Sequence, residues 1–257
     1  MEIAELWKGY TLEGSSSEAV FMIHGFTGTS AELYPAAERV HALGYTVLVP
    51  FMAGNTNNKE DLKKTNAEDW LESIRKEYRI ARKRYNRLYV LGLSMGGSIA
   101  LILAEEEEQK PDGLILYEPC LTIRNKFAYL AGFLKIFVPK MNFSPLSLPD
   151  NMEIYMQGPN GYYTKALQDL VKLTRRAKKN LSLVSVPFLC FYSLKDEMIT
   201  FSGIKKLLAV SSSKDKNLHI LSGSEHIISL ASSREEVFTA TADCLLSWKR
   251  KSTKKVS

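Results

Sequence analysis

Two alternating patterns of hydrophobic and polar positions run along the chain. Short, nearly continuous apolar runs rich in β-branched and aromatic residues are separated by longer segments with apolar residues at helical spacing. Continuous apolar runs of this kind are typical of parallel strands buried on both faces. The expected strands are Ala19–Ile23, Tyr45–Val49, Leu88–Leu91, Leu114–Tyr117, Pro187–Tyr192 and Leu218–Leu221. The expected helices are Ala31–Leu43, Ala67–Tyr85, Met95–Glu107, Phe201–Val210 and Arg234–Trp248. The alternation predicts an α/β protein with a doubly wound, mostly parallel sheet.

The alternation is interrupted between residues 121 and 180, where no strand pattern is evident. An apolar run, Phe127–Leu134, leads into a loop rich in Pro and Gly, and an amphipathic helical pattern begins at Thr164. This segment is too long for a simple connection between two strands. We therefore expect a helical cap (121–180) over a core formed by residues 1–120 and 181–250. The apolar run is expected to pack against the core and is a candidate lining for an acyl pocket. Docking on a lipid surface is a less favoured alternative, because the basic face and the aromatic run lie in separate stretches.

The length of the chain and the distribution of its charge favour a single globular domain and argue against a nucleic-acid-binding protein. The chain has 257 residues, which suits one large α/β domain with an insertion. Its formal net charge is +6, but the last nine residues contribute +5 of this and contain no acid. We interpret the basicity as a basic tail over residues 251–257 and predict no nucleic-acid partner.

Three widely spaced cysteines, Cys120, Cys190 and Cys244, show neither a disulfide framework nor a metal-ligand pattern, which favours a reducing compartment. The first residues are acidic where a signal peptide needs a basic start, and the longest apolar run is too short to cross a bilayer. We expect a cytoplasmic protein without stable membrane insertion.

A short motif follows the expected strand Leu88–Leu91. Residues 92–96 read Gly-Leu-Ser-Met-Gly, and a helical pattern begins within them. In this context Gly-x-Ser-x-Gly predicts a nucleophile elbow, a sharp turn that presents a serine hydroxyl beside a helix N-terminus. Gly92 and Gly96 fit, because a side chain two residues before or after Ser94 would collide with neighbouring backbone. The motif also occurs in ordinary turns, so the interpretation requires a base, an acid and oxyanion donors elsewhere.

Four histidines are candidates for the base. His24 precedes the serine, His41 lies on a helix, and His219 lies within a strand. Only His226 lies in a loop just past the last strand. In doubly wound serine hydrolases the partners follow in the order serine, acid, histidine. We therefore predict that His226 is the general base.

The orienting acid should lie on a loop at the carboxyl end of a strand that precedes the histidine. Asp196 meets this condition, because it follows the strand Pro187–Tyr192. Asp215 lies in a polar turn at the opposite end of the sheet. Glu118, directly after Leu114–Tyr117, is the serious rival, because some hydrolases place the acid one strand earlier. Asp196 is favoured.

An oxyanion hole needs two backbone N–H groups, each worth roughly 10²- to 10³-fold in rate. Met95, the residue after the nucleophile, is expected to supply one. The loop 24–28, His-Gly-Phe-Thr-Gly, follows an early strand, and the N–H of Phe26 is the predicted second donor. Gly25 is expected to let the backbone approach closely. A plain glycine turn is the alternative interpretation of this loop.

With these residues in place, the chain resembles α/β-hydrolases of the small bacterial carboxylesterase and monoacylglycerol lipase group. The similarity covers nearly the whole chain and rests on residues 24–28, 92–97, 196–199 and 226–230. The run Asp-Glu-Met-Ile that begins at Asp196 is the most group-specific of these. The resemblance implies the catalytic and oxyanion roles given above, and a small helical lid inserted after the sixth strand.

Two departures from the group concern the rim of the site. Residues 53–56 read Ala-Gly-Asn-Thr where the group usually has Gly-His-Gly, and Glu225 precedes the histidine where the group usually has Gly. Both leave the three catalytic residues intact.

The expected activity is hydrolysis of small-molecule carboxylic esters with short or medium acyl chains, monoacylglycerols among them, through an acyl-enzyme. This chemistry needs neither a metal nor an organic cofactor. A thioesterase or acyltransferase would use the same residues, and a serine peptidase or a non-catalytic binding scaffold are further alternatives. The serine at position 94 excludes hydrolases with an aspartate nucleophile.

Overall fold

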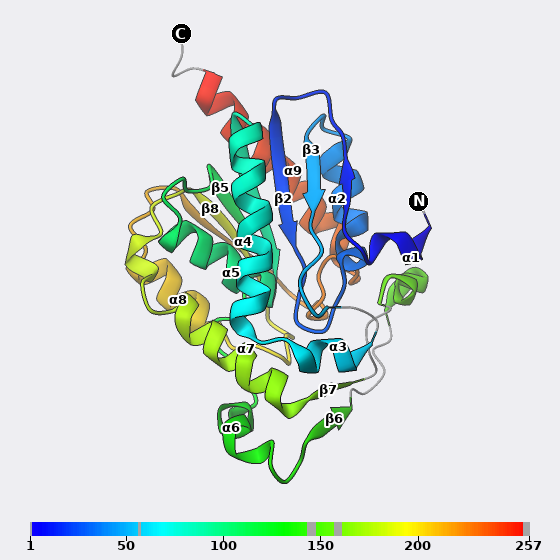
Figure 1. The fold of residues 1–257 in the computed structure, drawn as a ribbon. Coiled ribbons are helices and arrows are strands. Elements are labelled where there is room, and N and C mark those ends of the chain that lie inside the picture. The colour runs from blue at the N-terminus through cyan, green and yellow to red at the C-terminus, as the bar shows by residue number, and fades with distance from the viewer. Residues whose placement is uncertain (1, 56–57, 143–147, 157–160, 254–257) are drawn as a thin grey trace.

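The computed structural model describes residues 2–55, 58–142, 148–156 and 161–253. A seven-stranded sheet forms the centre of the molecule (Figure 1). The strand order is β1-β3-β2-β4-β5-β8-β9. Only the edge strand β1 is antiparallel to its neighbour, so the predicted mostly parallel sheet is confirmed. The strands are β1 (Tyr10–Leu12), β2 (Glu18–Ile23), β3 (Thr46–Val49), β4 (Arg87–Leu93), β5 (Gly113–Tyr117), β8 (Phe188–Ser193) and β9 (Lys216–Leu221).

Helices cover both faces of the sheet because alternate strand residues point to opposite faces. On β2, Phe21 and Ile23 belong to one hydrophobic cluster, whereas Val20 and Met22 belong to the other. The first cluster is completed by α4 (Ala67–Arg84), α5 (Met95–Glu106), α7 (Thr164–Ala177) and α8 (Phe201–Val210). The second is completed by α1 (Ile3–Leu6), α2 (Tyr34–His41) and α9 (Arg234–Thr253). This arrangement confirms the doubly wound fold.

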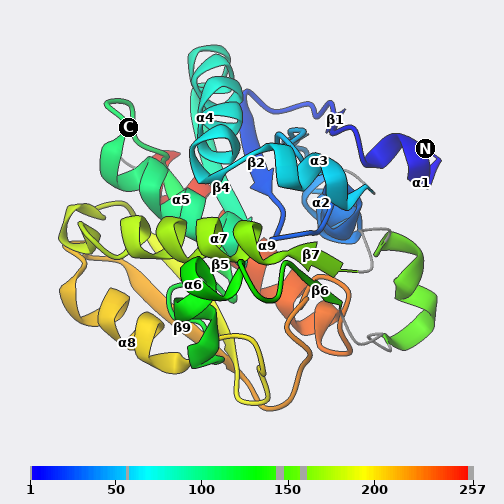
Figure 2. The same ribbon diagram turned by 60° about the horizontal axis from the view of Figure 1, so that its bottom comes forward.

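The cap lies over the carboxyl ends of the strands, and α7 crosses that edge of the sheet (Figure 2). Its described elements are a 3₁₀ turn η2 (Lys126–Leu130), α6 (Ala131–Leu134), β6 (Lys140–Asn142), a second 3₁₀ turn η3 (Pro149–Tyr155), β7 (Gly161–Tyr163) and α7. A further 3₁₀ turn, η4 (Leu181–Leu183), begins the second part of the core. Strands β6 and β7 pair in an antiparallel ladder. α3 (Lys59–Lys64), which belongs to the core, packs against β7.

Four details differ from the sequence-based expectations. The cap contains the β6–β7 ladder although no strand was expected, because strands of three residues leave no readable alternation. The cap was expected after the sixth strand but follows the fifth, β5. The count is lower by one because a single strand, β1, precedes β2. The helix expected from Ala31 begins as a 3₁₀ turn, η1 (Ser30–Leu33), and α9 continues to Thr253, inside the expected tail. Residues 254–257 lie outside the described part.

None of the helices in the described part of the chain combines the length and the apolar character that crossing a bilayer requires.

Candidate active site

Ser94 lies in a sharp turn between β4 and α5. Its backbone has φ 52° and ψ −110°, a conformation that residues other than glycine rarely adopt. The Ser94 N–H donates to the Tyr117 carbonyl at 2.8 Å, and the Ser94 carbonyl accepts from the Cys120 N–H at 2.9 Å. The neighbouring strand end therefore holds the strained turn on both sides. The turn has the form expected of a nucleophile elbow.

The glycines around Ser94 are required by close backbone contacts. A Cβ on Gly92 would lie 2.4 Å from the Gly96 carbonyl oxygen, and a Cβ on Gly96 would lie 2.1 Å from the Ile23 carbonyl oxygen. Both distances are far inside van der Waals contact. At Gly25 a Cβ would meet Ser94 Cβ at an ordinary 3.6 Å, so contacts within the protein do not by themselves require glycine there. A side chain at position 25 would instead take up space beside the serine.

The structure brings Ser94, His226 and Asp196 together as the sequence analysis expected. His226 Nε2 lies 2.8 Å from Ser94 Oγ, and His226 Nδ1 lies 2.6 Å from Asp196 Oδ2. The three residues follow the ends of β4, β9 and β8, which meet at one edge because these strands are parallel. Ser94 and His226 are partly exposed, whereas Asp196 is buried.

Asp196 is oriented by hydrogen bonds to both of its carboxylate oxygens. Oδ2 faces His226, while Oδ1 accepts from the N–H groups of Met198 at 2.7 Å and Ile199 at 2.8 Å. Burial by itself would raise the pKa of Asp196. The hydrogen bond and charge of His226, with the two N–H groups, outweigh burial and hold this pKa below its usual value. Asp196 is therefore an anion over the neutral pH range.

Glu118, the rival acid, lies beside this chain of hydrogen bonds but does not contact the histidine. Its carboxyl is fully buried, and Oε1 accepts from the Ser193 N–H at 2.5 Å. Burial, reinforced by the negative charge of Asp196, raises the pKa of Glu118 to about 10. Glu118 is consequently neutral where Asp196 is charged, and it cannot act as a second anion for His226.

Two backbone N–H groups are suited to an oxyanion, one in the loop after β2 and one at the start of α5. Within the described part of the chain, the N–H groups of Phe26 and Met95 donate to no other group. His24 is buried, its Nδ1 lies 2.9 Å from the Gly25 carbonyl, and burial lowers the pKa of His24 to about 4. Neutral His24 donates this hydrogen bond and fixes the loop, so it is unsuited to act as the base.

Several side chains that support the site were not found by sequence reasoning. Phe26 contacts the rings of Trp70 and Tyr162, with centroid distances of 5.9 and 5.3 Å. Ser193 Oγ donates to the Ser224 carbonyl at 2.8 Å and accepts from the Ser224 N–H at 2.9 Å. This pair joins the loops that carry the acid and the base. No local motif marks these residues, because each contact joins distant parts of the chain.

The apolar run of the cap packs on the core only in part. Ala128 and Ala131 are buried, but the large side chains of Phe127 and Phe133 are 69% and 64% exposed. The expected packing of this run is therefore limited to its small residues. The large apolar side chains face outward because the short turns η2 and α6 bury only their small residues.

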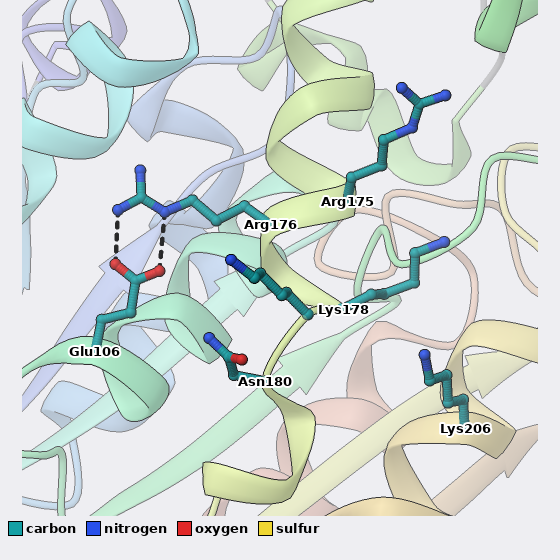
Figure 3. A pocket seen from close by; sticks show the side chains of 7 residues that line it. Glu106, Arg175, Arg176, Lys178, Asn180 and Lys206 are labelled. Carbon is teal, nitrogen blue, oxygen red and sulfur yellow. Dashed lines mark hydrogen bonds and ion pairs between the residues drawn. The ribbon is translucent and has the colours of Figure 1, made fainter.

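One cavity in the described structure lies away from these residues, at the carboxyl end of α7. It has a volume of about 690 Å³ and is shown in Figure 3. Arg176 points across it to Glu106, with which it forms two hydrogen bonds, while Arg175 points away from that pair. Its lining contains no serine, cysteine or histidine and does not include Ser94, Asp196 or His226. Among the described residues, no group of three or more His, Cys, Asp and Glu side chains is placed to hold a metal ion.

The chain has the α/β-hydrolase fold. A structure of the metagenome-derived lipolytic enzymes LipS and LipT superposes with a TM-score of 0.87 at 20% identity, covering 96% of this chain and all of that one. The monoacylglycerol lipase of Paleococcus ferrophilus superposes with a TM-score of 0.74 at 19% identity, covering 93% and 99%. At these identities the likeness establishes the fold alone.

Sequence comparison specifies the family. Residues 14–230 match the model of a family described as "Serine aminopeptidase, S33". The chain belongs to this family. The chain is 31% identical over 216 residues to the thermostable monoacylglycerol lipase of Bacillus sp. (strain H-257), covering 82% of this chain and 83% of the relative. It is 26% identical over 234 residues to a carboxylesterase of Bacillus subtilis (strain 168), covering 90% and 92%. The protein is a lipase/esterase-like hydrolase.

Proposed function

We propose that the protein hydrolyses carboxylic esters through an acyl-enzyme formed on Ser94. The observation that carries this proposal is the continuous chain from Ser94 Oγ through His226 to Asp196, with 2.8 and 2.6 Å separations at a strained elbow. A serine, a histidine and a buried carboxylate in this order make a hydroxyl nucleophilic at neutral pH.

The residues divide the reaction into two steps. Ser94 Oγ attacks the ester carbonyl carbon while His226 Nε2 takes the hydroxyl proton, and the carbonyl oxygen becomes an oxyanion near the N–H groups of Phe26 and Met95. The bond to the alcohol oxygen then breaks, and His226 returns the proton to the leaving alcohol. Water, deprotonated by the same histidine, attacks the acyl-enzyme and releases the carboxylic acid with regeneration of Ser94.

The proposed substrates are uncharged esters of short to medium acyl chains, including monoacylglycerols. The relatives named above are a monoacylglycerol lipase and a carboxylesterase. The first part of the cap, residues 121–142, presents several large apolar side chains and contains four basic residues but no acid. Such a rim suits an acyl chain, whereas the free α-amino group of a peptide would find no carboxylate partner there.

The test is a series of p-nitrophenyl esters of increasing acyl length, assayed with the wild type, Ser94→Ala and Ser202→Ala. Ser202 is an exposed serine of α8 and serves as the matched control. Loss of a triad nucleophile is expected to reduce turnover by about 10⁶-fold. Wild-type turnover by Ser94→Ala would refute the mechanism, as would an equal loss in the Ser202→Ala control.

Two alternatives are distinguished by substrate. If kcat/KM is higher for an acyl thioester than for the matched oxyester, the protein is a thioesterase. The family description includes aminopeptidases, so an aminoacyl p-nitroanilide is the third substrate. We expect kcat/KM for the p-nitrophenyl ester to exceed both.

A further inference from the structure

The first residues of the cap pair with the loop that carries Asp196. Ile123 and Ile199 form an antiparallel bridge. On either side of it, the Arg124 N–H donates to the Met198 carbonyl, and the Thr200 N–H donates to the Thr122 carbonyl, both at 2.9 Å. The cap and the acid loop therefore share a short backbone ladder.

This ladder includes the residues that orient the carboxylate. Asp196 Oδ1 accepts from the N–H groups of Met198 and Ile199, which are the residues paired with Arg124 and Ile123. A shift of the cap strand would therefore move the two N–H donors that fix the Asp196 side chain.

Arg124 adds a direct contact to the acid itself. Its Nη2 donates to the backbone carbonyl of Asp196 at 2.7 Å. A hydrogen bond from a charged guanidinium is roughly twice as strong as one between neutral groups. Ile199 anchors one end of the loop in the hydrophobic core, whereas Leu194 and Met198, on either side of the acid, are exposed. The Arg124 contact holds the loop at Asp196, between these two exposed side chains.

The ladder is anchored on its other side to the first turn of the cap. The Tyr129 hydroxyl in η2 accepts from the Ile123 N–H at 3.0 Å. The Asn125 side chain accepts from the Phe127 N–H at 3.0 Å, which fixes the start of the same turn. Arg124 thus lies between a turn of the cap and the loop of the triad acid.

We propose that Arg124 is a positioning residue for Asp196 and that, through it, the position of the cap sets the alignment of the acid with His226. The inference rests on the proposed function, because it needs Asp196 to orient the base. Arg124 holds the loop so that Asp196 Oδ2 stays directed at His226 Nδ1, and it makes no contact with the reacting atoms.

The test is steady-state hydrolysis of p-nitrophenyl butyrate from pH 5 to 9 by Arg124→Met and Arg124→Lys. With the acid misaligned, we expect kcat to fall about 10- to 100-fold in Arg124→Met, with KM unchanged within about 2-fold. A misaligned Asp196 also stabilises the protonated imidazole of His226 less, so the pH at which kcat/KM is half-maximal should be lower than in the wild type. If Arg124→Met acted only by removing a nearby positive charge, this pH would be higher than in the wild type. Arg124→Lys keeps the charge and should recover part of kcat.

Two further variants keep the result interpretable. Arg175→Met removes an exposed arginine of α7 and should match the wild type. Tyr129→Phe removes the acceptor of the Ile123 N–H and should give a smaller change in the same direction, which keeps the test available if Arg124→Met does not fold. An unchanged kcat, an upward shift of the pH profile, or a rise in KM alone would each overturn the inference. Wild-type activity in Ser94→Ala would refute the proposed function, whatever Arg124 does.

Discussion

Two strained residues lie at the carboxyl ends of the neighbouring strands β4 and β5. Ser94 and Glu118 both have positive φ, 52° and 47°, although neither is glycine. Each such backbone conformation costs about 1–3 kcal/mol of folding free energy and persists only where the surrounding structure imposes it. Here the two hydrogen bonds between Ser94 and the chain at Tyr117 and Cys120 impose it. The strain orients the Ser94 hydroxyl toward His226 before any substrate binds.

Gly96→Ala tests how tightly this turn is fixed. The new Cβ would overlap the Ile23 carbonyl, so we expect a loss of about 1–3 kcal/mol in the free energy of unfolding. A displacement of the elbow by about 1 Å should also lower kcat/KM about 100-fold. Gly132→Ala in α6 is the control, because its Cβ meets only the flexible Gln168 side chain at 3.2 Å. Urea titration and ester hydrolysis measure both effects, and a Gly96→Ala protein as stable and active as Gly132→Ala would contradict the account.

At the scale of elements, α7 joins the cap to the core. It lies in the cap segment of the sequence, yet its apolar face belongs to the same hydrophobic cluster as the sheet and α5. The buried residues of this face include Ala166, Leu170, Leu173 and Ala177. Among the described residues from η2 to β7, the buried hydrophobic side chains are scattered, at Ala128, Ala131, Leu148 and Tyr163. We infer that α7 unfolds with the core.

Leu173→Ala is the test of this inference. Leu173 is 2% exposed, so its truncation should cost about 2–5 kcal/mol in a single cooperative transition. Leu183→Ala is the matched control, because Leu183 is 50% exposed and should change stability by less than about 0.5 kcal/mol. Urea unfolding followed by both fluorescence and circular dichroism measures the change. Two separate transitions would show that α7 folds independently of the sheet.

Across the whole molecule, three buried carboxyls make stability depend on pH. Burial raises the pKa of Glu32 to about 8, of Glu105 to about 8 and of Glu118 to about 10. An unfolded glutamate ionises near pH 4.3. Above that pH the folded state holds protons that the unfolded state has released, so the free energy of unfolding falls as pH rises. This contribution is fully present below about pH 4 and is lost progressively up to the folded pKa of each group.

Glu118→Gln isolates one of these groups. A neutral glutamine keeps an acceptor for the Ser193 N–H and no longer ionises. We expect the variant to gain stability relative to the wild type as pH rises from 5 to 9, by up to about 1.4 kcal/mol per pH unit. Urea midpoints at pH 5, 7 and 9 measure this difference. Glu108→Gln, at an exposed glutamate, should show no such trend. A constant difference between wild type and Glu118→Gln would show that Glu118 is ionised in the folded protein.

The sheet, the elbow and the chain order of Ser94, Asp196 and His226 could be predicted from local patterns, namely apolar runs, a Gly-x-Ser-x-Gly turn and loops at strand ends. Parallel strands place such loops at one edge. The sequence also favoured Asp196 over Glu118, and the structure places Asp196, not Glu118, against the histidine. The pairing of Arg124 with the acid loop and the exposure of the Phe127 and Phe133 side chains became evident only from the tertiary structure. Those outcomes depend on contacts between segments tens of residues apart, which no local periodicity encodes.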